Sequence, residues 1–125
     1  MNIKKYFRLN SKEIKYILLT RNKFFLRWKA LNMNFIDQYE WKNYNKFWIW
    51  VPVKYSKSAV VRNKIRRMFY DIIWKQWLIG KPIDWKYKKI YVLLKKDYSE
   101  TEPEKIKEDI KKDLNKLFKF VLRKR

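Results

Sequence analysis

Five side chains that could grip phosphate groups lie close together near the middle of the 125-residue chain. They stand within the stretch SAVVRNKIRRMF, residues 58–69, and are Arg62, Asn63, Lys64, Arg66 and Arg67. An arginine guanidinium is a planar fork of N–H donors that meets two phosphate oxygens at once, whereas a lysine ammonium is a point charge. Lysine dominates the basic residues of this chain, so a cluster of arginines favours a chemical role for the stretch.

A helix over residues 58–78 is predicted to position these side chains. Ser58 can cap its start, and Gly80 lies just beyond its end. At about 100° per residue, the apolar residues share one arc that faces a core, and the cations lie beside that arc together with Tyr70. The apolar arc comprises Val61, Ile65, Met68, Phe69 and Ile72. Lys54 and Lys57 precede the helix, where backbone N–H groups also favour anions.

The alternative interpretation is that the cations only solvate the outer side of an amphipathic helix. Residues 58–78 contain a single acid, Asp71, so the helix offers few of the intrahelical ion pairs that are usual on such a surface. We therefore favour a phosphate-binding helix over a merely solvated one. The expected RNA contacts are Lys54, Lys57, Arg62, Asn63, Lys64, Arg66 and Arg67.

The composition indicates a folded domain with a polyanionic partner. The sequence is 47% hydrophobic and 19% aromatic, which is enough to build a core, and its net charge is +21. Such an excess opposes folding by self-repulsion and favours nucleic acid as a partner, with the surface of an anionic membrane as the second candidate. No apolar run approaches the length of about 20 residues that a membrane span needs, and we expect a cytoplasmic protein.

The residue types argue against an active site of the protein's own. The chain has no Cys and no His, which excludes thiol nucleophiles, histidine bases and Cys/His zinc sites. A metal-dependent nuclease would need clustered carboxylates, whereas Asp37, Asp71, Asp84 and Asp97 are scattered along the chain. We therefore expect no catalytic residue and no metal ligand in this protein.

The remaining periodicities predict one domain over residues 1–125 with an α+β, or α/β sandwich, fold. Its single mixed sheet is packed with about three helices. Pro52 cannot donate to a strand ladder and suggests an edge strand or a bulge. The predicted elements, besides the helix over 58–78, are helices over 11–21 and about 101–122, strands over 23–31, 46–54 and 88–95, and a loop over 32–45.

The stretch AVVRNKIRRMF resembles the Arg-Asn-Arg helix signature of the bacterial ribonuclease P protein component. The residues that match this signature outright are Ala59, Val60, Arg62, Asn63, Ile65 and Arg67. Lys64 and Arg66 exchange one basic residue for another, and Lys54 fits the first position of a lysine pair that precedes the helix. The stretches RLNSKEIKYIL, FFLRWKAL, KIYVLLKK and DLNKLFKFVLRK are similar, more loosely, to the family's first helix, first strand, later strand and closing helix.

The resemblance implies a protein subunit that binds a catalytic RNA and the 5′ leader of precursor tRNA. The RNA removes the leader with Mg²⁺ ions that are bound chiefly by the RNA and the substrate, not by the protein. The family fold is an α/β sandwich with a left-handed β-α-β crossover, whereas general rules favour a right-handed one. Its leader cleft lies between the sheet and the first helix, where we place Phe25, Trp28 and Lys95.

Three other classes of protein share the small size and the charge. A ribosomal or other structural RNA-binding protein is the nearest alternative, because it would need no catalytic RNA partner. A DNA-binding regulator would need a helix-turn-helix partner just before the basic helix, where a strand is predicted instead. A membrane-active cationic protein would have little need for a sheet. We therefore expect the ribonuclease P RNA and precursor tRNA as partners, and neither DNA nor a membrane.

Overall fold

The computed structural model describes residues 7–28, 30–54, 58–95 and 103–119. Four strands in these ranges form one mixed sheet in the order β1-β2-β4-β3. The elements are α1 (Ser11–Leu19), β1 (Phe24–Arg27), β2 (Leu31–Asp37), β3 (Lys46–Trp50), α2 (Ala59–Lys75), the short 3-10 helix η2 (Leu78–Gly80), β4 (Lys88–Leu94) and α3 (Pro103–Phe118). The predicted α+β class with one mixed sheet and three α-helices is confirmed.

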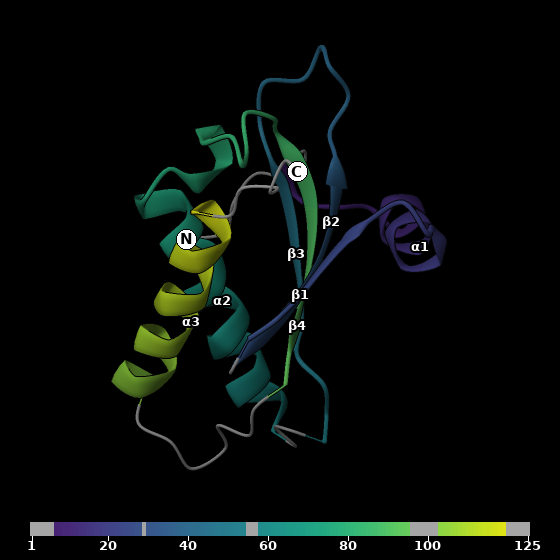
Figure 1. The fold of residues 1–125 in the computed structure, drawn as a ribbon. Coiled ribbons are helices and arrows are strands. Elements are labelled where there is room, and N and C mark those ends of the chain that lie inside the picture. Colours follow the sequence, from purple (N-terminus) through teal and green to yellow (C-terminus); the bar gives the residue numbers. More distant parts are fainter. Residues whose placement is uncertain (1–6, 29, 55–57, 96–102, 120–125) are drawn as a thin grey trace.

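The sheet separates two unequal helical layers. The helices α2 and α3 lie on one side of it and α1 lies on the other (Figure 1). β1, β2 and β4 pair antiparallel, whereas β3 pairs parallel with β4, so β3, α2 and β4 form a β-α-β unit. The left-handed sense of this crossover stays a prediction. The edge position of β3 agrees with the interpretation of Pro52, which follows the strand.

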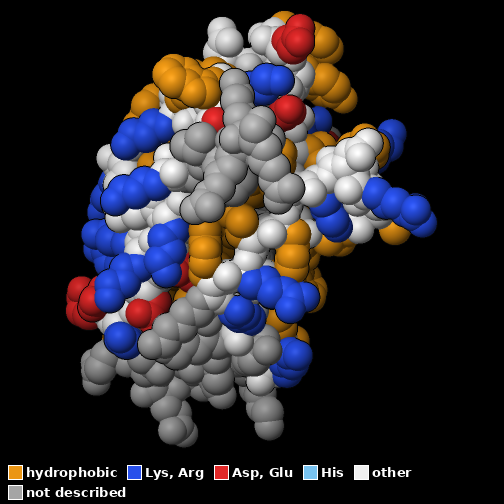
Figure 2. Space-filling model, in the orientation of Figure 1, with side chains coloured by type: hydrophobic (Ala, Val, Ile, Leu, Met, Phe, Trp, Pro, Cys, Tyr) orange, Lys and Arg blue, Asp and Glu red, His pale blue; other side chains and the backbone are white. Residues whose placement is uncertain are grey.

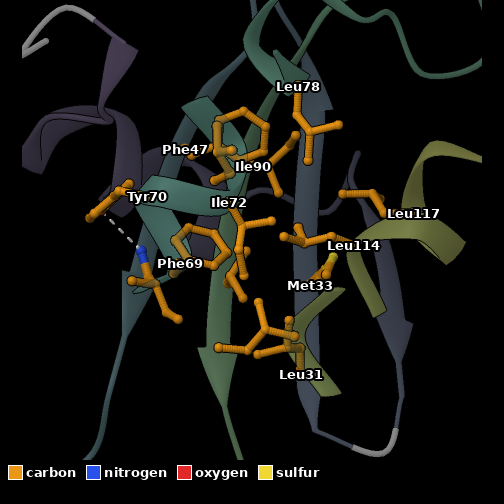
Figure 3. Packing of buried hydrophobic residues seen from close by; sticks show 14 of the residues in the cluster. Leu31, Met33, Phe47, Phe69, Tyr70, Ile72, Leu78, Ile90, Leu114 and Leu117 are labelled. Carbon is orange, nitrogen blue, oxygen red and sulfur yellow. Dashed lines mark hydrogen bonds between the residues drawn. The ribbon is translucent and has the colours of Figure 1, made fainter. Parts of the chain in front are cut away.

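The hydrophobic core lies between the sheet and the layer of α2 and α3 (Figure 3). Ile65, Phe69 and Ile72 of α2 are buried, as the predicted arc requires, and Leu114 and Leu117 of α3 pack beside them. From the sheet, alternate residues enter this core because side chains of a strand alternate between its two faces. They include Leu31, Met33, Phe35, Phe47, Ile49, Ile90, Val92 and Leu94.

The prediction of a loop over 32–45 is wrong in its first half, which forms the central strand β2. Leu31, Met33 and Phe35 are fully buried and alternate with Asn32 and Asn34, which face the other side of the sheet. Asparagine has a low strand propensity, but pairing with β1 and β4 on both sides outweighs it. The predicted strand over 23–31 is correspondingly a short β1 followed by a hairpin turn.

That hairpin turn is held by an acidic residue of α3. The buried Asp113 carboxylate accepts hydrogen bonds from the backbone N–H groups of Ala30 and Leu31, each at 3.0 Å. Asp113 thereby fastens α3 to the sheet, because a carboxylate oxygen can accept from two backbone donors at once.

The basic helix α2 ends three residues earlier than predicted. Its last residue is Lys75, and Trp77 adopts a left-handed φ of 51° that turns the chain into η2. A Cβ atom added to Gly80 would lie 2.3 Å from the indole Nε1 of Trp77. Gly80 is therefore required at this point for close approach of the Trp77 ring, not for an unusual backbone angle.

Candidate nucleic-acid interface

The predicted signature side chains lie on the side of α2 that is not buried in the core, where Arg62 and Arg66 form one strip and Asn63 and Arg67 the next. Ser58 caps the helix, as predicted, by accepting the Val61 N–H at 3.4 Å. Arg66 donates from Nη1 to the Asn63 side-chain oxygen at 2.9 Å, so these two residues, one turn apart, orient each other. Asn63, Lys64 and Arg67 are exposed, and Arg62 and Arg66 are half-buried.

Lys54 is exposed before the helix, and Lys57 lies outside the described residues. Lys and Arg side chains gather over the side of the molecule formed by α2 and α3 (Figure 2).

Tyr70 does not belong to this exposed strip, contrary to the sequence-based prediction. Its side chain is buried, and its hydroxyl accepts the backbone N–H of Ile49 at 3.4 Å (Figure 3). Burial raises the pKa of Tyr70, while the Ile49 bond and the positive charges of Arg8 and Arg66 act in the opposite direction. Arg8, which pairs beside β3, therefore joins Arg66 at the β3 edge.

The sheet face that α2 and α3 do not cover carries aromatic, amide and basic side chains in rows across the strands. One row, from β1 to β3, is Phe25, Asn34, Tyr91 and Trp48, and the next is Arg27, Asn32, Leu93 and Trp50. We call these eight residues the open face. Phe25 is 44% exposed and Trp50 46% exposed. The Arg27 guanidinium carbon lies 5.1 Å from the Phe25 ring centroid, so the two side chains stack.

The residues expected in the leader cleft do not all lie on this face. Phe25 is part of it, and Lys95 follows β4 in the same alternation as Tyr91 and Leu93. Trp28 instead packs against the hydrophobic core. The opposite orientations of Phe25 and Trp28 follow from the two-residue period of the strand.

Sequence reasoning missed Arg27, Trp48, Trp50 and Tyr91. The alternation of side chains along a strand puts Arg27 on the same side as Phe25, so this residue could have been found from the sequence. The other three residues were not identified, because their membership of one face depends on the pairing of β3 and β4 with β2. No local pattern in the sequence fixes that pairing.

α1 closes one end of the open face and is fastened there by Glu13. The Glu13 carboxylate contacts the Nζ atoms of Lys46 at 2.6 Å and Lys89 at 3.1 Å, and the neighbouring Ile17 is fully buried against the sheet. Asn10 and Glu13 also form a reciprocal capping box at the start of the helix. Burial alone would raise the pKa of Glu13, but the hydrogen bonds from Lys46, Asn10 and Lys89 outweigh it and hold the pKa below its ordinary value.

Within the described residues, no group of three or more acidic, histidine or cysteine side chains is placed to hold a metal ion. Of the helices in the described ranges, none is long and apolar enough to cross a membrane.

Comparisons with known proteins connect this arrangement to one family. The sequence model of the ribonuclease P family, described as "Ribonuclease P", matches residues 3–119. A solved structure of the RNase P protein from Thermotoga maritima superposes with a TM-score of 0.70 at 23% identity, covering 90% of this chain and 96% of that one. The RNase P protein from Staphylococcus aureus gives a TM-score of 0.71 at 16% identity, covering 90% and 97%. Among curated proteins, none matches the sequence.

These solved structures share the fold, and the family match spans nearly the whole chain, including the signature helix and the open face. A ribosomal protein, the nearest alternative from the sequence, is therefore not favoured. The chain belongs to the ribonuclease P family, and it is a protein subunit of ribonuclease P, the ribonucleoprotein that processes the 5′ leaders of tRNA.

Proposed function

We propose that the signature strip of α2 binds the catalytic RNA of ribonuclease P. The observation that carries this proposal is the grouping of Arg62, Asn63, Lys64, Arg66 and Arg67 on one side of a helix whose other side is buried. The bond from Arg66 to Asn63 holds one guanidinium in place before RNA arrives. A fork that is already oriented loses less side-chain entropy on binding phosphate. Lys54 and Lys57 extend the proposed contact beyond the start of the helix.

The open face is the proposed site for the 5′ leader of precursor tRNA. Its partly exposed rings, Phe25 and Trp50 among them, can stack on unpaired bases, and Arg27 and Lys95 supply positive charge for the backbone. The amides of Asn32 and Asn34 offer donors and acceptors between the rings.

The proposed reaction leaves the chemistry to RNA. Mg²⁺ ions bound chiefly by the RNA and the precursor tRNA supply the metal chemistry, and the protein's residues bind and orient the two RNA molecules. This division of labour fits the described residues, which hold cations and rings in place of clustered carboxylates. A cytoplasmic location, with neither DNA nor a membrane as partner, accompanies this proposal.

Reconstitution tests the proposed contact on α2. The purified chain is mixed with its own organism's ribonuclease P RNA and a 5′-extended precursor tRNA at low Mg²⁺, and leader release is measured. We expect cleavage that depends on both RNA and protein. Arg62→Ala together with Arg66→Ala should weaken binding of the catalytic RNA and lower the salt slope of affinity by about two, or about one for each lost phosphate contact.

The matched control removes two charges from another helix of the same protein. Lys105→Ala together with Lys112→Ala on α3 changes the net charge equally but leaves the signature strip intact. If both double variants lower affinity and slope to the same extent, general charge accounts for binding and the α2 site is wrong. Leader release by the protein without RNA would overturn the proposed division of labour.

A further inference from the structure

The loop between β2 and β3, residues 38–45, presents a stacked pair of exposed aromatic rings. Tyr39 and Trp41 are 54% and 73% exposed, their ring centroids are 4.8 Å apart, and their planes differ by only 6°. The loop projects beyond the sheet at the end where β4 begins (Figure 1), and hydrophobic side chains gather at that end of the surface (Figure 2). Exposed aromatic rings offer flat faces on which an unpaired base can stack.

The ring pair is fixed to the rest of the protein by a chain of charged contacts. The Lys89 ammonium lies 4.1 Å from the Tyr39 ring centroid, and the same ammonium contacts the Glu13 carboxylate at 3.1 Å. Lys89 is itself buried in the sheet. The Tyr39 ring therefore packs on the buried ammonium of Lys89, and this cation–π attraction limits the movement of the ring.

Hydrogen bonds hold both ends of the loop. At its start, the Gln38 side chain accepts the Tyr39 N–H at 3.2 Å and donates to the Tyr44 carbonyl at 3.3 Å. At its end, the buried Asn45 side chain donates to the Leu78 carbonyl at 2.8 Å and accepts the Lys88 N–H at 2.6 Å. A platform that is ordered in advance binds with less entropic cost.

A cleft of about 630 Å³ opens beside Tyr39, on the side of α1 away from Ile14 and Leu18. Lys12 and Tyr16 of α1 and Asn22 line one wall, whereas Ile36, Asp37, Tyr39 and Lys89 line the other. Two acids, Glu13 and Asp37, also border this cleft. Glu13 is paired with Lys46 and Lys89, and Asp37 with Lys86 and Lys88, so the surroundings keep an excess of positive charge.

We propose that this site, made of the Tyr39–Trp41 pair and the adjoining cleft, binds one unpaired nucleotide of RNA, with its base stacked on the ring pair. This site is separate from the open face, because α1 lies between them. The side of α1 that carries Tyr16 lines the cleft, whereas the side that carries Ile14 does not. The occupant is RNA rather than an apolar protein segment, because the exposed ammonium groups of Lys12, which lines the cleft, and of Lys86, beside Asp37, suit phosphate. Within the loop, Lys42 offsets the one acid, Glu40.

The NMR signals of the tryptophan indole N–H groups report on this site separately from other RNA contacts. The full chain is labelled with ¹⁵N and titrated with the single-stranded RNA hexamer A6 or with an abasic oligoribonucleotide of equal length. The Trp41→Phe variant assigns the Trp41 indole signal among the seven tryptophans. We expect A6 to shift the Trp41 signal and the abasic chain to shift it much less, because stacking requires a base.

Affinity measurements then compare Trp41, which stacks on Tyr39, with Trp85, which lies outside that pair. In a Phe25→Ala, Trp50→Ala background, which weakens the open face, Trp41→Ala should reduce A6 affinity at least about fivefold with no change in salt slope. Trp41→Phe should retain most of the affinity because it keeps a ring. The control is Trp85→Ala, which removes a ring that is 91% exposed and lies outside the Tyr39–Trp41 pair, and it should leave affinity unchanged.

Three results would overturn the proposal. The first is a Trp41 signal that A6 does not shift, and the second is a loss of affinity in Trp85→Ala equal to that in Trp41→Ala. The third is a Trp41 shift that depends on protein concentration alone, which would indicate a second copy of the chain as the occupant. Because the catalytic RNA is absent from both experiments, failure here leaves the role of α2 untouched. Conversely, failed reconstitution with a shifted Trp41 signal would count against the proposed function and not against this site.

Discussion

The Glu13 carboxylate holds α1 to the sheet together with the buried Ile17, and Glu13→Gln tests the contribution of the carboxylate. In the wild-type protein, Glu13 faces the ammonium groups of Lys46 and Lys89, whose side chains are 14% and 8% exposed. Removing one partner of a buried ion pair costs about 3–5 kcal/mol, because the remaining charge stays buried without compensation. Glutamine keeps one acceptor oxygen, so we expect a loss near the lower limit, about 3 kcal/mol of unfolding free energy.

Urea denaturation followed by tryptophan fluorescence measures this loss, and an exposed ion pair supplies the control. Glu108 pairs with Lys112 on α3 at 3.5 Å, and both side chains are more than half exposed. Glu108→Gln makes the same chemical change and should cost at most about 0.5 kcal/mol, because solvent screens exposed pairs. Hydrogen exchange should also show faster opening of α1 in Glu13→Gln but not in Glu108→Gln.

The pH dependence gives a second, independent readout of Glu13. Its pKa in the folded protein is held below the value of about 4.3 that an unfolded chain would show. The unfolded state therefore binds more protons in this range, so the stabilisation is complete above about pH 4.3 and is lost as the pH falls through the lower folded pKa. The stability difference between wild type and Glu13→Gln should shrink in that acidic window. Equal midpoints for the two glutamine variants at pH 7, or a difference that does not change with acid, would refute the reasoning.

Two further predictions concern contacts that shape the sheet and the end of α2. Asp113→Ala should destabilise the protein by about 3 kcal/mol in urea denaturation, because the buried N–H groups of Ala30 and Leu31 lose their acceptor. Asp113→Asn keeps an acceptor oxygen and should cost clearly less. Equal losses of stability in the two variants would contradict the role of the carboxylate oxygen. Gly80→Ala should lower the free energy of unfolding by about 1–3 kcal/mol through the clash with the Trp77 indole. In a Trp77→Ala, Gly80→Ala double variant, part of this stability should be recovered because the ring is absent. If the loss in the double variant equals the sum of the losses in the two single variants, the clash is refuted.

The parts of the fold that the sequence predicted are those determined by neighbouring residues. α2 was recognisable because its cap, its apolar arc and its stop all lie within one stretch, and the same periodicity placed Arg62, Arg66 and Arg67 beside the buried side. The position of these three arginines on α2 could therefore be predicted. Its aromatic neighbour Tyr70 could not, because only the contact with Ile49 in β3 decides that the ring turns inward.

The features that escaped prediction depend on contacts between distant parts of the chain. β2 has a clear alternation in LNMNFID, but the asparagines and the polar residues after it favoured a loop, and only pairing on both sides makes it the centre of the sheet. Asp113 acts on a backbone N–H that lies 83 positions earlier in the chain. The open face likewise needs four strands in register before Arg27, Trp48 and Tyr91 share one surface.

The β3 edge explains how the catalytic RNA on α2 and the precursor tRNA leader on the open face could lie next to each other. Ile49 points into the core, and its backbone N–H bonds to Tyr70 of α2. Its neighbours in β3, Trp48 and Trp50, point to the open face, because side chains alternate along a strand. Arg66 lies one helical turn before Tyr70, so its guanidinium stands at the same edge. β3 is the last named strand of the sheet, and the segment at Arg8 and Leu9 pairs along its outer edge. Within the described residues, Arg66 and the rings of the open face therefore lie on either side of this edge, and RNA bound at one surface would lie close to RNA bound at the other.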